Sequence, residues 1–185
     1  MLKKYLISTI ISFILLSSVA IAREIKEVPH WKKSTVSVYI PKGENDNAAN
    51  MLRSAFGRWQ VESYGHLKFK YLEKGPADIN IVFSDNASSS DTPIASTKIT
   101  SSNNEITKAE ISIATKNKDY KTFSNSYISK VMLHEVGHAL GIPTNTTKKS
   151  SIMYAPVTES QKLMKIDTRK LFSISEWDYG KKNLK

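Results

Sequence analysis

The segment HEVGHALGIPT, which starts at His134, constrains the fold of this 185-residue chain more than any other segment. Residues four apart lie on one face of an α-helix, about one turn from each other. A helix over this segment therefore presents His134 and His138 side by side. Gly141 is placed to end the helix with a left-handed turn, and Pro143 prevents its continuation. The chain must bend there, which can bring Thr144 back towards the two imidazoles.

The two histidines and the glutamate that follows the first form an HExxH pattern, which favours a metal site. Zinc binds imidazole nitrogens at about 2.0–2.1 Å, and two imidazoles on one helix face can share an ion. Glu135 lies about 100° further round the helix, beside such an ion rather than on it. From there it can take a proton from a water that attacks a carbonyl carbon, the chemistry of HExxH metalloproteases.

The other side of this helix is apolar and predicts a packed face, made of Ile128, Met132, Leu133, Val136, Ala139 and Leu140. Two histidines four apart also occur by chance on surface helices. A second motif, SSIMY at 150–154, argues against chance here.

HEVGHALG followed by SIMY resembles the metzincin metalloproteases, whose pattern is HExxHxxGxxH with a downstream Met-turn. Over roughly residues 31–180 the chain is most similar to the matrixins, the matrix-metalloproteinase-like group. The resemblance implies that His134 and His138 bind one catalytic zinc ion. It also implies that Glu135 is the general base and that Met153 lies beneath the metal. The residues after the turn would then form a wall of the substrate pocket: Tyr154, Ala155, Pro156 and Val157.

The chain departs from the family pattern at the third zinc ligand, where Thr144 stands in place of a histidine or aspartate. A threonine hydroxyl is a poor zinc ligand at neutral pH. The site could hold zinc with two imidazoles and extra waters, bind it weakly, or stay empty. Glu159 and Glu176 are distant alternative ligands. The remaining histidines, His30 and His66, lie far upstream and are not expected to contact the metal.

Residues 1–22 have the organisation of a secretory signal peptide. Lys3 and Lys4 form a basic start, an apolar run follows, and Ala20-Ile21-Ala22 fits the A-x-A cleavage pattern. We therefore expect cleavage after Ala22 and a secreted or periplasmic protein. The alternative is an uncleaved membrane anchor, for which the apolar run is short.

The remaining portion, residues 23–185, has the length of a single matrixin-like catalytic domain. It holds 25 basic and 17 acidic residues, a formal charge of +8. The lysines are scattered without an aromatic-interleaved stripe, so we expect no nucleic-acid partner. The chain has no cysteine, which excludes disulfides and a latency switch based on a propeptide thiol. A monomer that binds peptide or protein substrates, with no stable membrane anchor, is expected.

Hydrophobic periodicity predicts an α+β fold with five strands and two long helices. The resemblance adds that the sheet is twisted and mixed, and that a Met-turn and a short C-terminal helix follow. The predicted strands cover residues 34–40, 67–71, 78–83, 94–100 and 106–114. The helices begin at Asp46, at Ser124 or Asn125, and near Ser173 or Ser175, while 87–92 and 101–105 are loops.

Large aromatic residues are assigned to the core rather than to function: Trp31, Phe56, Trp59 and Trp177. Asp178 resembles the acid that supports the Met-turn in the family, and it fits equally well as a charge in the first turn of a helix. Residues 84–105 contain no counterpart of the histidine- and aspartate-rich loop of the family, so no calcium or structural zinc site is assigned.

These features predict a secreted zinc-dependent metalloendopeptidase. Its peptide substrate would lie extended along an edge strand near residues 94–99 and pair with its backbone. Thr144 motivates the alternative, a catalytically impaired matrixin-like protein that binds peptides or proteins in the same groove. A weaker third possibility is a basic protein that binds an anionic envelope and retains a vestigial metal site.

Overall fold

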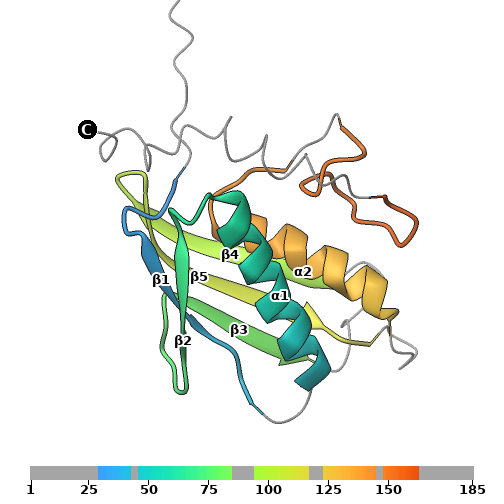
Figure 1. The fold of residues 1–185 in the computed structure, drawn as a ribbon, viewed down its shortest axis with the longest axis horizontal. Coiled ribbons are helices and arrows are strands. Elements are labelled where there is room, and N and C mark those ends of the chain that lie inside the picture. The colour runs from blue at the N-terminus through green and yellow to red at the C-terminus, as the bar shows by residue number, and fades with distance from the viewer. Residues whose placement is uncertain (1–28, 43–45, 85–93, 117–122, 145–147, 163–185) are drawn as a thin grey trace, which may run out of the picture.

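A computed structural model describes residues 29–42, 46–84, 94–116, 123–144 and 148–162 of the chain. Its regular elements are five strands and two helices, and both helices pack side by side on one face of the sheet (Figure 1). In chain order they are β1 (Thr35–Tyr39), α1 (Asp46–Glu62), β2 (Lys68–Leu72), β3 (Ile79–Ser84), β4 (Ala95–Ser102), β5 (Glu105–Ala114) and α2 (Asn125–Ala139).

The sheet is mixed, with the strand order β2-β1-β3-β5-β4. β1 runs parallel to both β2 and β3, and β3 runs parallel to β5. Only β4 is antiparallel, and it pairs with β5 at one edge of the sheet. The predicted α+β class, five-stranded mixed sheet and two long helices are therefore confirmed. The short C-terminal helix, Trp177 and Asp178 lie outside the described residues.

The segment 101–105, predicted as a loop, is mostly strand. β4 continues to Ser102, β5 begins at Glu105, and only Asn103 and Asn104 separate them. Both asparagines have positive φ, at 49° and 59°. Two consecutive positive φ angles are typical of the two-residue type I′ turn, whose twist matches that of the strands it joins. Asparagine adopts positive φ more easily than most residues. The Asn-Asn pair was the overlooked signal for a hairpin.

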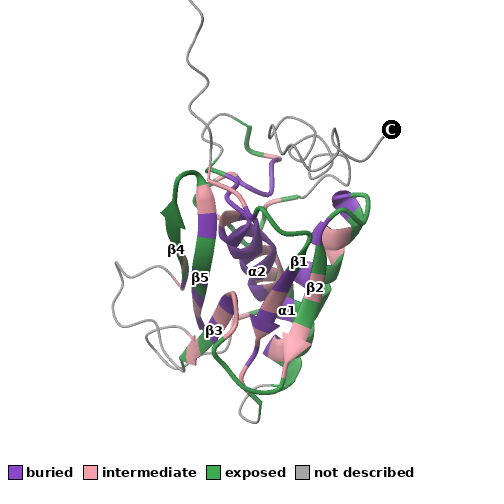
Figure 2. Cartoon of the chain, turned by 90° about the vertical axis from the view of Figure 1, so that its left-hand side faces the viewer, coloured by how far each residue is buried: buried purple, intermediate pink, exposed green. Residues whose placement is uncertain are grey.

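The core lies between the sheet and the helices, and α2 is buried on most of its surface (Figure 2). Alternate residues of the central strands point into it, including Val36 and Val38 of β1 and Ile79 and Ile81 of β3. These residues are β-branched, which suits strands buried by a covering layer. The predicted core residues Trp31, Phe56 and Trp59 are fully buried, as expected.

The start of the described chain is tied to the far end of α2. The Trp31 indole N–H donates to the Ala139 carbonyl oxygen, 2.9 Å away. The backbone of His30 pairs with the β4–β5 hairpin through the Asn104 oxygen and the Ile106 amide. The Trp31 contact fixes the last turn of α2. The His30 backbone has a structural role, because it is hydrogen-bonded to the β4–β5 hairpin.

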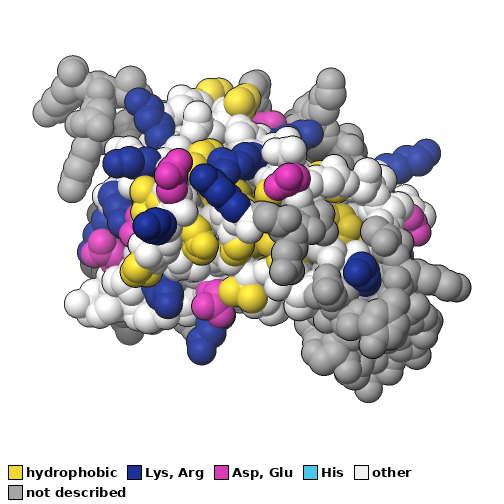
Figure 3. Space-filling model, turned by 90° about the horizontal axis from the view of Figure 1, so that it is seen from below, with side chains coloured by type: hydrophobic (Ala, Val, Ile, Leu, Met, Phe, Trp, Pro, Cys, Tyr) yellow, Lys and Arg dark blue, Asp and Glu magenta, His cyan; other side chains and the backbone are white. Residues whose placement is uncertain are grey.

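Lysine and arginine side chains are interspersed with aspartate and glutamate on the face seen from below (Figure 3). Charged surface pairs include Lys33 with Asp78 and Lys32 with Glu105. Among the residues that the structure describes, no helix combines the length and the apolar character required to cross a membrane.

Candidate metal centre

Helix α2 carries the HExxH residues and begins with a side-chain cap. The Ser124 hydroxyl oxygen accepts from the Tyr127 amide at 3.2 Å, which satisfies one of the unpaired N–H groups of the first turn. The Ser124 backbone is extended, as expected for a capping residue. The start predicted at Ser124 or Asn125 is therefore confirmed.

The helix ends at a glycine in the left-handed conformation, as the sequence predicted. Gly141 has φ of +91°, its amide donates to the His138 oxygen at 2.8 Å, and the Ile142 amide donates to the Gly137 oxygen at 3.0 Å. These two bonds make a Schellman motif, which closes the helix and reverses the chain. The reversal returns residues 142–144 to the histidine face of the helix.

The two histidines converge on one point. His134 Nε2 and His138 Nε2 are 3.0 Å apart, and the rings are perpendicular, with their centroids separated by 4.6 Å. In each ring the other nitrogen, Nδ1, faces a backbone carbonyl oxygen: Ile152 at 2.6 Å for His134 and Ile142 at 2.8 Å for His138. A carbonyl oxygen only accepts, so Nδ1 donates in both rings, and in a neutral imidazole Nε2 is then the nitrogen with the lone pair.

Burial favours the neutral imidazole that metal binding requires. His134 is 4% exposed. Desolvation lowers the pKa of His134 below its ordinary value of 6.5, and the charge of His138 acts in the same direction. The Ile152 hydrogen bond and Glu135 oppose the shift without reversing it. The structure thus keeps His134 neutral near pH 7, with its free lone pair directed at the other histidine.

Glu135 is buried beside this pair and is held from the sheet. The Thr97 hydroxyl, on edge strand β4, lies 2.6 Å from Glu135 Oε2 and 3.0 Å from the backbone oxygen of the same residue. The carboxylate is 38 residues distant from Thr97 in sequence, so the packing of α2 against β4 creates this contact. Glu135 is near enough to His134 for its charge to act on the pKa of that histidine.

Met153 lies under the helix, in the turn that follows it. Both Met153 and Ile152 are buried, and the Met153 amide donates to the Ser151 hydroxyl oxygen at 3.1 Å. The turn packs against α2 at Gly137, where a β-carbon would overlap the Met153 sulfur. Because the same turn supplies the Ile152 carbonyl oxygen, its packing and the orientation of the His134 ring are linked.

Thr144 reaches the histidine pair through the reversal after the helix. Its hydroxyl oxygen lies 3.5 Å from His138 Nε2, and the residue is exposed. Two ligands on a tetrahedral zinc ion stand about 3.3 Å apart, which follows from metal–nitrogen bonds of about 2.0–2.1 Å. The separations of 3.0 and 3.5 Å bracket that value. The two imidazoles are therefore spaced as zinc ligands are, and the Thr144 hydroxyl lies at a similar distance from one of them, His138.

No cluster of three or more histidine, cysteine, aspartate or glutamate side chains suited to a metal ion occurs among the described residues. Glu159, one of the two alternative ligands, is engaged elsewhere. Its carboxylate accepts from the Ser124 hydroxyl at the start of α2, and its backbone oxygen accepts from Lys130. Ser124 and His138 are fourteen residues apart on one helix, about 21 Å at 1.5 Å per residue. Glu176 lies outside the described residues.

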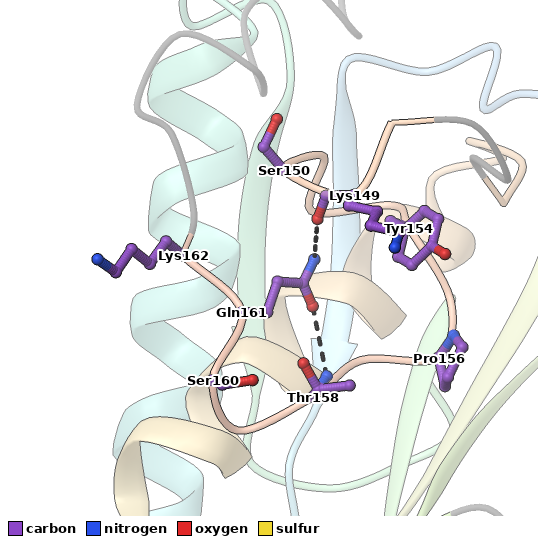
Figure 4. Close-up of a pocket in the computed structure, with 8 residues that line it drawn as sticks. All are labelled: Lys149, Ser150, Tyr154, Pro156, Thr158, Ser160, Gln161 and Lys162. Atoms are coloured by element: carbon purple, nitrogen blue, oxygen red, sulfur yellow. Dashed lines mark hydrogen bonds between the residues drawn. The ribbon is translucent and has the colours of Figure 1, made fainter.

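The residues expected to form a pocket wall follow the Met-turn. Val157 packs against the core and its oxygen accepts from the Tyr127 hydroxyl at 3.4 Å, whereas Ala155 is exposed. Tyr154 and Pro156 line a hollow of about 520 Å³ (Figure 4). Its other lining residues are Lys149, Ser150, Thr158, Ser160, Gln161 and Lys162, and it includes neither histidine of the pair.

Gln161 gives this loop its shape. Its amide nitrogen donates to the Ser151 oxygen at 2.8 Å. The same nitrogen donates to the Lys149 oxygen at 3.3 Å, and its amide oxygen accepts from the Thr158 amide (Figure 4). One side chain therefore joins the segment before the Met-turn to the segment after it.

The sequence pointed to the histidines, Glu135, Met153 and Thr144, and the structure places Thr144 beside the histidine pair. The sequence did not point to the two backbone carbonyl oxygens that orient the imidazoles, because every residue has a backbone carbonyl and its role leaves no trace in residue type. Thr97 was detectable: it is a hydroxyl between Ala95 and Ile99, on the inward-facing side of an alternating strand.

Comparison with protein-family models matches residues 30–176 to the family described as Matrixin. Comparison with curated proteins finds no match.

Proposed function

The chain belongs to the matrixin family and carries a metallopeptidase-type domain, and we propose that it is a secreted zinc-dependent metalloendopeptidase. The observation that supports this most directly is the convergence of His134 Nε2 and His138 Nε2 with their lone pairs free. Two lone pairs 3.0 Å apart repel unless a cation or a proton lies between them. A divalent metal ion satisfies both at once.

His134 and His138 would hold the zinc ion, and the Thr144 hydroxyl or a water would complete the site. Zinc supplies Lewis acidity there, which polarises the scissile carbonyl and lowers the pKa of water towards about 7. The Ile142 and Ile152 carbonyl oxygens keep Nδ1 protonated in both rings. Hydrogen bonds of this kind fix the tautomer and the ring orientation of metal-binding histidines.

Glu135 would act as the general base. Its carboxylate takes the proton from the attacking water and passes it to the leaving amine, so that one group serves both halves of the hydrolysis. The buried position of Glu135 against β4 limits its movement, which favours proton transfer over a fixed distance.

The substrate would bind as an extra strand. Among the described residues β4 pairs with β5 alone, so its other edge would offer backbone groups to an extended peptide. Helix α2 packs directly against this strand, so a peptide bound along β4 would lie close to Glu135. Residues 1–22 are proposed to direct export, and the exported protein is proposed to act as a monomer on peptides or proteins.

A second function is favoured by one observation, the threonine at position 144. A protein with this site that binds zinc weakly would capture peptides along β4 without cleaving them. The two functions differ in metal content and in turnover, and both are measurable on the same preparation.

The test is elemental analysis of the purified protein together with a peptidase assay in the presence and absence of a chelator. The proposal expects one zinc ion per chain and cleavage that the chelator abolishes and zinc restores. Glu135→Ala is expected to lose cleavage by roughly 10²–10⁴-fold while it retains zinc and the fold. A protein that stays metal-free in excess zinc, or a Glu135→Ala variant with full activity, would contradict the proposal.

A further inference from the structure

We propose that Thr97 is a positioning residue for Glu135: its hydroxyl holds the carboxylate in the orientation that proton transfer requires. The inference rests on the proposed function, because it assigns to Glu135 the role of general base. It adds a residue from the sheet to a site otherwise formed by α2 and the segments that follow it.

The contact has the geometry of a strong hydrogen bond. Thr97 Oγ1 and Glu135 Oε2 are 2.6 Å apart, within the range of hydroxyl-to-carboxylate bonds, about 2.5–2.7 Å. The backbone oxygen of Glu135 lies 3.0 Å from the same hydroxyl. A hydroxyl has a single proton, and the charged and closer oxygen is the stronger acceptor. The proton therefore lies mainly towards Oε2.

This single bond restricts a side chain that otherwise has three rotatable torsions. Thr97 Oγ1 contacts both the backbone and the end of the side chain of Glu135, so it fixes the carboxylate relative to the helix. Within the described part of the chain, no other donor reaches this carboxylate. Oε2 is engaged by Thr97, and Oε1 is the oxygen left to accept a proton from water.

Threonine is suited to this position because its β-branched side chain has few rotamers in a strand. Thr97 pairs with Ile111 of β5 in the sheet register, so its backbone is anchored by the strand next to it. The same residue belongs to the edge along which the substrate would pair. Movement of β4 on peptide binding would therefore move the hydroxyl that holds the base.

A purely structural role for Thr97 would mean that the hydroxyl only satisfies a buried carboxylate. The two roles differ in what they change. Loss of a structural contact lowers stability, with kcat and KM unchanged for the molecules that remain folded. Loss of a positioning contact lowers kcat and leaves KM almost unchanged, because the base acts in the transition state rather than in binding.

The experiment compares Thr97→Val, which keeps the shape and removes the hydroxyl, with Thr97→Ser, which keeps the hydroxyl. Thr35→Val is the control, since Thr35 is exposed on β1, which is separated from the substrate edge β4 by two other strands. The probe is a quenched-fluorescent peptide that the zinc-loaded natural protein cleaves. We expect Thr97→Val to lower kcat roughly tenfold, less than the roughly 10²–10⁴-fold loss when the base itself is removed. Thr97→Ser and Thr35→Val should retain kcat within about twofold.

A second readout does not depend on activity. Urea unfolding of the metal-free protein is measured for Thr97→Val, Glu135→Ala and the double variant. If the bond exists, the shifts of the unfolding midpoint do not add, and the double variant loses less than the sum of the single losses. Additive shifts would overturn the proposal.

The outcomes separate this inference from the proposed function. If Glu135→Ala keeps full activity, Glu135 is not the general base, and the positioning role of Thr97 is refuted as well. If Glu135→Ala is inactive while Thr97→Val keeps the natural kcat, only the positioning role is overturned. Non-additive unfolding with a lower kcat and rescue by serine supports it.

Discussion

The Met153 sulfur packs so closely on Gly137 that a β-carbon at position 137 would overlap it and stand 2.8 Å from Trp59 Cζ2. Gly137 lies in the last turn of α2, and glycine inside a helix costs about 0.5–1 kcal/mol relative to alanine. The absence of a side chain lets the turn that carries Met153 approach the helix backbone. That approach also places the Ile152 carbonyl oxygen against His134 Nδ1.

Gly137→Ala is therefore expected to destabilise the protein, although alanine is the better helix former. The added methyl group must displace the Met153 side chain and the Trp59 ring, an overpacking cost of about 1–3 kcal/mol. The measurement is the free energy of unfolding from urea titration. Gly57→Ala is the control, because Gly57 is also inside a helix and a β-carbon there meets nothing within 4 Å. It should gain up to about 1 kcal/mol, and a similar gain for Gly137→Ala would contradict the packing.

Gly141→Ala tests the turn that returns the chain to the histidines. Gly141 has φ of +91°, and a β-carbon would overlap the Pro29 carbonyl oxygen and lie 3.1 Å from its carbon. Gly65→Ala separates the two effects, because Gly65 has φ of +76° but open space around it. Left-handed strain alone should cost roughly 1–2 kcal/mol at Gly65. Gly141→Ala should cost more in the same unfolding titration, and equal losses would show that the Pro29 contact is unimportant.

Thr144→His tests whether the third corner of the site limits metal binding. The Thr144 hydroxyl lies 3.5 Å from His138 Nε2, so an imidazole at this position is within reach of the same ion. The variant is expected to bind zinc roughly 10–100-fold more tightly. Loss of a residue that only hydrogen-bonds a metal ligand already changes affinity by this factor, so a new ligand should change it at least as much. Competition with a chelating dye gives the affinity. Thr35→His, on an exposed position of β1, controls for an added histidine. Unchanged affinity in Thr144→His would place the third ligand elsewhere.

Asp78→Asn tests the polar link between β1 and β3. The Asp78 carboxylate accepts from Lys33 Nζ at 2.6 Å and from the Ser37 amide and hydroxyl at 2.8 and 2.7 Å. Burial raises the pKa of Asp78, but these hydrogen bonds and the Lys33 charge outweigh it and hold the pKa below the ordinary value of 3.8. Removal of the charge should cost roughly 1–3 kcal/mol near pH 7.

The pH dependence has a definite sign. A depressed pKa in the folded state stabilises the protein above the unfolded-state value of 3.8, and this stability is lost as the pH falls through the lower folded-state pKa. The difference between the natural protein and Asp78→Asn should therefore shrink below about pH 4. Glu73→Gln, which removes an exposed carboxylate, should have little effect at any pH. A difference that stays constant down to pH 2 would rule out the ionic contribution.

Local patterns were sufficient for most elements because their signals lie within a few residues. Alternation of Val36 and Val38 predicted a strand, and the helix start predicted at Asp46 is the start of α1. The hairpin at Asn103–Asn104 was missed since asparagine is a weaker turn signal than glycine. Strand order and direction were taken from the family resemblance, because pairing joins segments far apart in the chain.

The sequence by itself determined the chemistry that is available: two imidazoles one turn apart, a carboxylate beside them, a glycine that ends their helix, and a threonine three residues after that glycine. Periodicity and end signals are local, so residue order alone specifies them. Only the tertiary structure decided which nitrogen of each ring is free, because Ile142 and Ile152 contribute backbone oxygens that every residue possesses. The packing of β4 on α2 likewise decided that Thr97 meets Glu135, a contact across 38 residues that no local pattern encodes.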